Sequence, residues 1–415
     1  MKKTLVALAA LAATGAFAQV TMYGSIDVAF GVKTHTAGDG STQSKTSGVM
    51  EGLNAGNRIG FRGTEDLGGG LKANFTIENG LNITNGALFS TRAAAAGQQI
   101  DGYGAPAGNM PTGAYSTSTN RQSYVGLESA SLGELRLGYQ YTNLYRLSTL
   151  SGYMNGSEQP GSDIAHIMSN ADFGGTRANG LTYISPRFSG VQVTLQHGAG
   201  AGRELVETSQ AGVSATSNGV TVNGVADVAQ VRNSAMFNYN GVKNLDVAYA
   251  YTVFMARAGA NAGSTALPTN LFAVSAGATT AAAASDNTSR LHQLGASYNF
   301  GMAKLSGTYN TGTRDLSITS DSDKYTAYQV GVEGMLGAFR PYAQFGSGKI
   351  IRTNAGGVDT TTGDFKTQQF GVRYDLSKRT TAYVMMGTSK DDAAAATAAG
   401  LAKREITAAG IYHAF

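Results

Sequence analysis

Apolar and polar residues alternate, position by position, in many short segments of this chain. In the segment 19–35, Val20, Met22 and Ile26 share one face, whereas Ser25 and Asp27 share the other. Successive side chains of a β-strand point to opposite faces, so the alternation predicts strands with one apolar and one polar face. The charged residues of these segments keep to the polar face. The fold class predicted from this feature is all-β.

Reading the alternation along the chain predicts about sixteen strands, an even number typical of bacterial membrane barrels. They cover residues 19–35, 54–65, 70–80, 120–129, 133–141, 178–186, 190–198, 230–240, 243–254, 289–300, 302–313, 324–336, 338–348, 366–376, 379–388 and 403–415. Pro341 interrupts one of them and would remove a ladder donor.

The predicted connections alternate strictly between short and long. This is the arrangement of an antiparallel up-and-down barrel, with tight turns at one rim and long loops at the other. The long connections cover residues 36–53, 81–119, 142–177, 199–229, 255–288, 314–323, 349–365 and 389–402.

The N-terminal segment 1–18 predicts export. Lys2 and Lys3 precede an apolar stretch, and Ala16-Phe17-Ala18 suits a signal peptidase. The alternative, a retained membrane helix, needs about 20 apolar residues, more than this stretch supplies. The mature chain should begin at Gln19, and residues 19–415 are predicted to form a single barrel domain because no linker is visible.

Composition narrows the function classes. The chain has no cysteine, which excludes disulfides, a thiolate nucleophile and a cysteine metal site. Its formal charge of +4 falls to +2 when Lys2 and Lys3 leave with the signal, and so small a surplus gives no support for nucleic-acid binding. Tryptophan is absent, but 20 Tyr and 16 Phe are enough for aromatic girdles at membrane interfaces.

Export and alternation together predict a closed transmembrane barrel in an outer membrane. In hydrocarbon every backbone polar group must bond to a neighbouring strand, and only closure achieves this for a sheet. The last segment, EITAAGIYHAF, fits this reading, since Thr407, Ala409 and Ile411 share one face and Phe415 ends the chain. A Lys or Arg on the lipid face costs roughly 2–4 kcal/mol at mid-bilayer, so the charged faces must look into water. A barrel of about sixteen strands is too wide for side chains to fill and leaves an aqueous channel.

Several stretches resemble the general porins of Gram-negative outer membranes, most closely the β-proteobacterial kind. They are VTMYGSIDVAFG (20–31), NRIGFRGTEDLGGGLKANFTIENG (57–80), NRQSYVGLESASLGELRLGYQYT (120–142), LTYISPRFSGVQV (181–193), YDLSKRTTAYVMMG (374–387) and GIYHAF (410–415). The resemblance implies a homotrimer in contact with outer-membrane lipid and lipopolysaccharide, a passive channel for ions and small hydrophilic solutes. It also implies that Phe415 is an assembly signature and that the third outer loop, here about 142–177, folds into the channel.

In such porins, basic wall residues oppose acidic loop residues across a constriction. By motif position the bases are Arg58, Arg62, Arg121 and Arg177, and Arg136 points inward by alternation. The resemblance makes Glu158, Asp163 and Asp172 the candidate loop acids, although the usual proline-glutamate-phenylalanine-glycine tip is replaced by SEQPGSD (157–163). The inward arginine excess suggests some anion preference. Alternatively, some of these arginines are merely solvated, or paired with Glu65, Asp66 or Glu128.

Two rival functions stay open at this point. One is a substrate-specific channel of the same fold, which a saturating solute would block. The other is an outer-membrane hydrolase, which would favour a narrower barrel of about ten strands with a Ser or Asp near a His on the rim. None of the five histidines, His35, His166, His197, His292 and His413, lies within metal-ligand spacing of another. The sequence therefore predicts no enzyme activity, no metal and no cofactor.

Overall fold

The computed structural model describes residues 20–84, 120–151, 177–199, 215–217, 220–222, 229–258, 285–316, 320–393 and 401–415. Residues 1–19 lie outside this set, so the signal segment stays a prediction. Among the described residues, no helix is both long enough and apolar enough to cross a membrane.

The described residues are almost entirely β-strand. The strands are β1 Thr21–Ala37, β2 Thr42–Glu51, β3 Arg58–Gly68, β4 Leu71–Gly80, β5 Asn120–Ser129, β6 Gly133–Tyr141, β7 Arg177–Ile184, β8 Val191–Ala199, β9 Ala215–Ser217, β10 Val220–Val222, β11 Ala229–Tyr239, β12 Leu245–Ala258, β13 Ser285–Asn299, β14 Ala303–Leu316, β15 Asp321–Gly334, β16 Phe339–Thr353, β17 Asp359–Asp375, β18 Thr380–Asp391 and β19 Leu401–Ala414. One helix, α2 Asn143–Ser151, follows β6.

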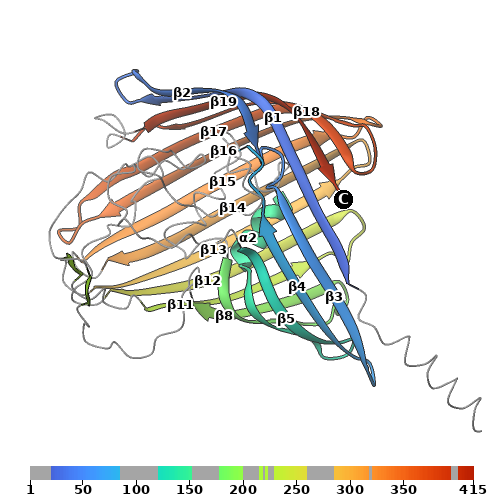
Figure 1. Ribbon diagram of the computed structural model, residues 1–415. Coiled ribbons are helices and arrows are strands. Elements are labelled where there is room, and N and C mark those ends of the chain that lie inside the picture. Colours follow the sequence, from blue (N-terminus) through green and yellow to red (C-terminus); the bar gives the residue numbers. More distant parts are fainter. Residues whose placement is uncertain are drawn as a thin grey trace, which may run out of the picture.

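These strands close into a barrel (Figure 1). Neighbouring strands run antiparallel, β8 pairs with β11, and the first strand pairs with the last from Ser25↔Ala414 to Ala37↔Leu401. β2 and β3 both pair with β1, over Val28–Thr36 and Thr21–Ser25 respectively, and together occupy one position in the wall. Counted this way, the described chain forms a closed barrel of sixteen strands, which confirms the predicted fold class.

Several predicted boundaries are wrong at the long-loop rim. β2 lies within the predicted loop 36–53, the hairpin of β9 and β10 lies within 199–229, and β17 begins at Asp359 rather than 366. Strand ends that rise above hydrocarbon need no apolar face, so the alternation that reveals a strand fades there. Pro341 does not end its strand, since β16 continues through it in register with Val372 of β17.

The predicted faces are confirmed in β1. Met22 and Phe30 are 57% and 67% exposed on the outer wall, while Ser25 and Asp27 are 2% and 0% exposed on the inner side. An outer wall of exposed large apolar side chains is stable only against lipid. The inner wall carries the charged and polar groups.

Helix α2 lies inside the ring of strands (Figure 1). The hydroxyl of Thr142 accepts a hydrogen bond from the backbone N–H of Tyr145 at 3.2 Å, which caps the helix N-terminus. Leu144 and Leu147 are fully buried, and Leu147 packs with Met236, Ala248 and Ala250 on the inner face of β11 and β12. The chain therefore turns inward as soon as β6 ends.

Candidate functional site

A buried network on the inner wall joins β1, β4, β5 and β6. Arg121 Nε donates to Glu78 Oε1 at 2.7 Å, and Arg121 Nη2 donates to the Tyr141 hydroxyl at 2.8 Å. The hydroxyls of Tyr141 and Tyr23 both donate to Glu78, each at 3.0 Å. Charge-assisted bonds of this kind are stronger than neutral ones, and three donors converge on one carboxylate. The network fixes Arg121 in a single orientation.

The orientation of Arg121 depends on a β-bulge. The register between β4 and β5 shifts between Glu78 and Asn79, which pair with Gln122 and Asn120 respectively. Arg121 is the extra residue between these two pairs, and a bulge re-aims the side chain it carries. Simple alternation with the inward Tyr124 would have sent Arg121 toward lipid, whereas the bulge turns it inward.

Two further arginines lie on β3. Arg58 is half-buried, and its Nε donates to Ser25 Oγ at 3.2 Å and to the Gly56 carbonyl at 3.1 Å. Arg62 is exposed, and its guanidinium carbon lies 5.2 Å from the centre of the Tyr23 ring. That distance is within the range of a cation–π contact.

Two arginines and a second tyrosine contact the ring of Tyr141. The guanidinium carbons of Arg177 and Arg121 lie 5.2 and 5.9 Å from the centre of its ring, and Tyr145 of α2 stacks on it at 4.7 Å. Alternation with the exposed Leu135 and Leu137 would send Tyr141 toward lipid, but its side chain lies on the inner wall at the end of β6, where the chain turns into α2.

Arg136 has a different role in the structure. It makes two parallel hydrogen bonds of 2.7 Å to Glu134, close to the β5–β6 turn, and its guanidinium lies over Tyr124. Glu134 also accepts from the Asn74 side chain at 2.8 Å. Arg136 is thus a structurally paired residue apart from the Tyr141 group, and its partner is none of the acids considered from sequence.

The predicted acids of the opposing loop, Glu158, Asp163 and Asp172, lie outside the described residues. The acid that the structure places beside the wall bases is Glu78, which the sequence analysis did not single out. Its position on the polar face of β4 could have revealed it. Nearby in α2, burial, and then the charge of Arg136, lower the pKa of Arg146 to about 10, so this residue stays protonated at neutral pH.

The opposite wall, β14 to β17, also carries more bases than acids. Asp323 accepts from Arg314 at 2.5 Å and from Arg352 at 2.8 and 2.9 Å. Nearer the short turns, Arg340 and Arg373 contact Glu333, and Arg340 also pairs with Asp375. In these ion pairs four arginines face three carboxylates.

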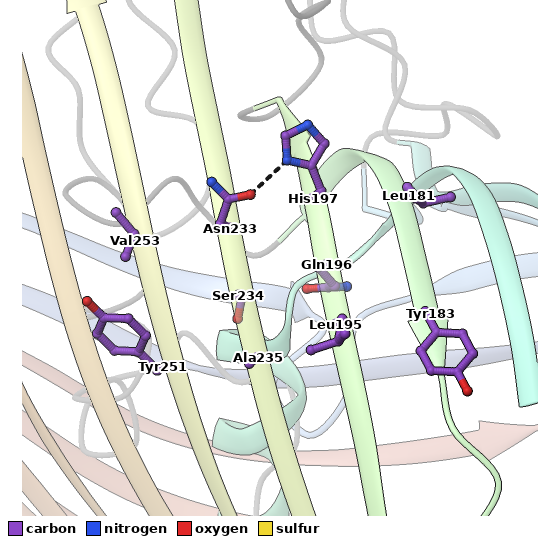
Figure 2. A pocket seen from close by; sticks show the side chains of 10 residues that line it. All are labelled: Leu181, Tyr183, Leu195, Gln196, His197, Asn233, Ser234, Ala235, Tyr251 and Val253. Atoms are coloured by element: carbon purple, nitrogen blue, oxygen red, sulfur yellow. Dashed lines mark hydrogen bonds between the residues drawn. The ribbon is translucent and has the colours of Figure 1, made fainter.

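A pocket of about 460 Å³ lies on the outer wall over β7, β8, β11 and β12 (Figure 2). Leu181, Leu195 and Tyr251 line it from the face opposite to the buried Thr194 and Ala250. A polar pair borders it, with His197 Nδ1 2.7 Å from Asn233 Oδ1. Because its lining faces lipid, this pocket does not belong to the water-filled interior.

The described histidines lie apart from one another. His292 bonds to Tyr249 at 2.7 Å and His413 to Thr380 at 2.9 Å, both on exposed positions, and His35 is buried in β1 rather than in or beside a loop. His166 lies outside the described residues. Across the described ranges, no group of three His, Asp or Glu side chains could hold a metal ion.

A closed membrane barrel with a charged inner wall defines the class of outer-membrane channels. The model of the Gram-negative porin family matches residues 4–394, and the chain belongs to this family. It is 30% identical to outer membrane porin protein 32 of Delftia acidovorans, over 99% of this chain and 95% of that protein. It is 27% identical to an outer membrane porin of Bordetella pertussis, over 97% of this chain and 99% of that one.

Among solved structures, the chain is similar to the anion-selective porin from Comamonas acidovorans, with a TM-score of 0.64 and 20% identity over 96% of this chain and 100% of that one. The outer-membrane channel DcaP of Acinetobacter baumannii aligns with a TM-score of 0.57 and 13% identity, over 96% and 97% of the two chains. These likenesses show a shared fold. The protein is a multi-pass outer-membrane porin that forms a channel for ions and small hydrophilic solutes.

Proposed function

We propose that this porin passes anions in preference to cations, and that the group around Tyr141 is its selectivity site. One observation carries the proposal: three guanidinium groups, those of Arg58, Arg121 and Arg177, lie on this part of the inner wall, and one of them is paired with Glu78. A ring of fixed positive charge favours anions in a pore. The similar fold of a porin named for anion selectivity supports the same reading.

We further propose that the loop 142–177 narrows the channel, with Glu158, Asp163 and Asp172 facing the wall bases. The inward course of α2 supports this arrangement, because it brings the start of the loop against β11–β13. Arg62 lies four residues after Arg58 on β3, nearer the short turn between β3 and β4. We propose that it is a second contact for anions there.

The assembly is proposed to be a homotrimer surrounded by lipid and lipopolysaccharide. A related outer-membrane protein of Vibrio cholerae, with a TM-score of 0.58, is known in a trimer form. A channel without enzyme activity is proposed, since the family is one of channels. Hydrolysis of a peptide or phospholipid by the pure protein would contradict this.

The selectivity proposal is tested by Arg58→Gln combined with Arg177→Gln. A monovalent anion about 4 Å from one guanidinium gains about 1 kcal/mol in water, so losing two charges should lower the anion-to-cation permeability ratio by about fivefold or more. The measurement is the reversal potential in a salt gradient across a planar bilayer.

Arg187→Gln is the matched control, because Arg187 is exposed at the β7–β8 turn and bonds to Asn238 and Asn240 there. Its reversal potential should equal that of the wild type. If the double variant also keeps the wild-type potential, Arg58 and Arg177 do not set selectivity. Titration with small organic anions in the same recordings separates general diffusion from a substrate-specific channel, which would show saturable block.

A further inference from the structure

One wall strand is broken, and the break lies inside the barrel. β2 ends at Glu51 and β3 begins at Arg58, although both pair with β1. The six residues between them, Gly52 to Asn57, take no part in the ladder. Leu53, Asn54 and Ala55 are buried. We call this segment the 52–57 break.

Asp27 holds the break from the inner face of β1. Its carboxylate accepts from the backbone N–H groups of Asn54 at 2.5 Å and Ala55 at 2.8 Å, and from the Tyr383 hydroxyl at 2.7 Å. Its own backbone accepts from the Gly52 N–H and donates to the Asn57 side chain. A buried carboxylate is costly unless donors surround it, and here the donors come mainly from the break.

Leu53 adds an apolar anchor. It is 1% exposed and packs in a cluster on the inner wall of β1, β16, β18 and β19. The cluster contains Ala29, Tyr342, Tyr383, Met385, Ile406 and Ala408. Apolar side chains on a wetted wall are unfavourable unless covered, and Leu53 contributes to their cover.

The break also contacts the arginine site. The Gly56 carbonyl accepts from Arg58 Nε at 3.1 Å. A Cβ atom at Gly56 would lie 2.8 Å from Arg121 Nη1, so only glycine lets this guanidinium approach so closely. The break therefore helps to orient Arg58, and it borders the guanidinium of Arg121.

We propose that the 52–57 break is a fixed, lumen-facing element that narrows the channel and sets the position of Arg58 and Arg121, and that Asp27 is its positioning residue. This inference rests on the proposed function, because the selectivity site it serves is the one around Tyr141. Channel width would then depend on this short segment of the wall as well as on the third loop.

Asp27→Ala removes the acceptor and should release the break. We expect single-channel conductance to rise roughly 1.5-fold or more, since conductance follows the open cross-section. The anion preference should fall at the same time, because the Gly56 carbonyl of the released break no longer orients Arg58. In an Asp27→Ala background, Leu53→Cys should react with a charged, membrane-impermeant thiol reagent, whereas Leu53→Cys alone should stay protected. The natural chain has no cysteine to interfere.

Asp391→Ala is the matched control. Asp391 is equally buried and accepts from the backbone N–H groups of Asp364 and Ala393, but these bonds lie at the far end of β17 and β18. Its conductance and selectivity should match the wild type.

If Asp27→Ala does not assemble, the variants Leu53→Ala and Gly56→Ala test the inference instead. The first loosens the apolar anchor and should raise conductance, whereas the second displaces Arg121 and should lower anion preference. Assembled variants with wild-type conductance and selectivity overturn the inference. A wild-type protein that forms channels without anion preference would instead overturn the proposed function.

Discussion

At the residue scale, alternation placed most side chains and failed where the backbone departs from a regular strand. Glu78 lies on the inward face that alternation assigns to it. Arg121 faces inward only because a bulge shifts the register beside it, and Tyr141 does so because its strand ends. Neither the bulge nor the strand end can be recognised from the residue types at these positions. The wall bases could thus be named from sequence, but not their partners.

Gly24 lies at the end of the β1–β19 seam, against the C-terminal phenylalanine. Gly24 exchanges backbone hydrogen bonds of 3.0 and 3.1 Å with Phe415, and a Cβ on Gly24 would lie 2.4 Å from the phenylalanine ring. Gly24→Ala should therefore lower the free energy of unfolding by about 1–3 kcal/mol, the usual cost of overpacking.

The measurement is the urea midpoint of the refolded barrel in detergent. Gly307→Ala serves as the control, since the nearest atom to its new Cβ is 3.2 Å away and it lies mid-strand in β14. Equal midpoints for the two variants would contradict the role assigned to Gly24.

At the scale of elements, the strands within the hydrocarbon layer could be predicted, because lipid on one side and water on the other enforce the alternation. β2 could not, since its sequence TQSKTSGVME has no continuous apolar face. Helix α2 was equally hidden, because its nine residues follow a strand without any break in composition. It is stabilised by the capping hydroxyl of Thr142 and by packing on the inner face of β11 to β13.

The seat of α2 on the inner wall gives a second prediction. Leu147 is fully buried, and a Cβ on Gly295 would lie 3.0 Å from its Cδ2 atom. Leu147→Ala should cost the docked helix about 2–5 kcal/mol. The helix should then detach for part of the time while the barrel persists, and open-channel current noise should increase.

Noise is measured at constant voltage in planar bilayers. Leu195→Ala is the control, because Leu195 faces lipid on the outer wall and is exposed. Quiet currents in Leu147→Ala, equal to those of the control, would show that α2 does not depend on this contact.

At the scale of the whole molecule, charge is distributed unevenly along the inner wall. In the ion pairs of β14 to β17 four arginines face three carboxylates, and around Tyr141 three arginines lie together, one of them paired with Glu78. The chain as a whole carries only +4. Arginines therefore outnumber carboxylates in these two groups, which total composition does not reveal.

This internal charge predicts a selectivity that depends on salt. The Debye length is about 10 Å at 0.1 M and about 3 Å at 1 M. The electrostatic field of the fixed arginines therefore extends over much less of the channel at high salt. The anion-to-cation permeability ratio should fall toward unity over this range. Reversal potentials at a constant concentration ratio measure it, with the flux of a neutral sugar as the control that should not change. A ratio independent of salt would place the selectivity in direct contact with ions rather than in the field.

The pairing of β1 with β19 has a consequence for biogenesis. The last strand, β19, supplies the seam that β1 needs, so a nascent product that lacks it leaves β1 with an open edge. The polypeptide must cross the inner membrane and the periplasm with its edges unsatisfied, and it becomes competent for insertion only once synthesis is complete. During that transit the strand edges can pair with other chains, so any partner that covers them would suppress aggregation.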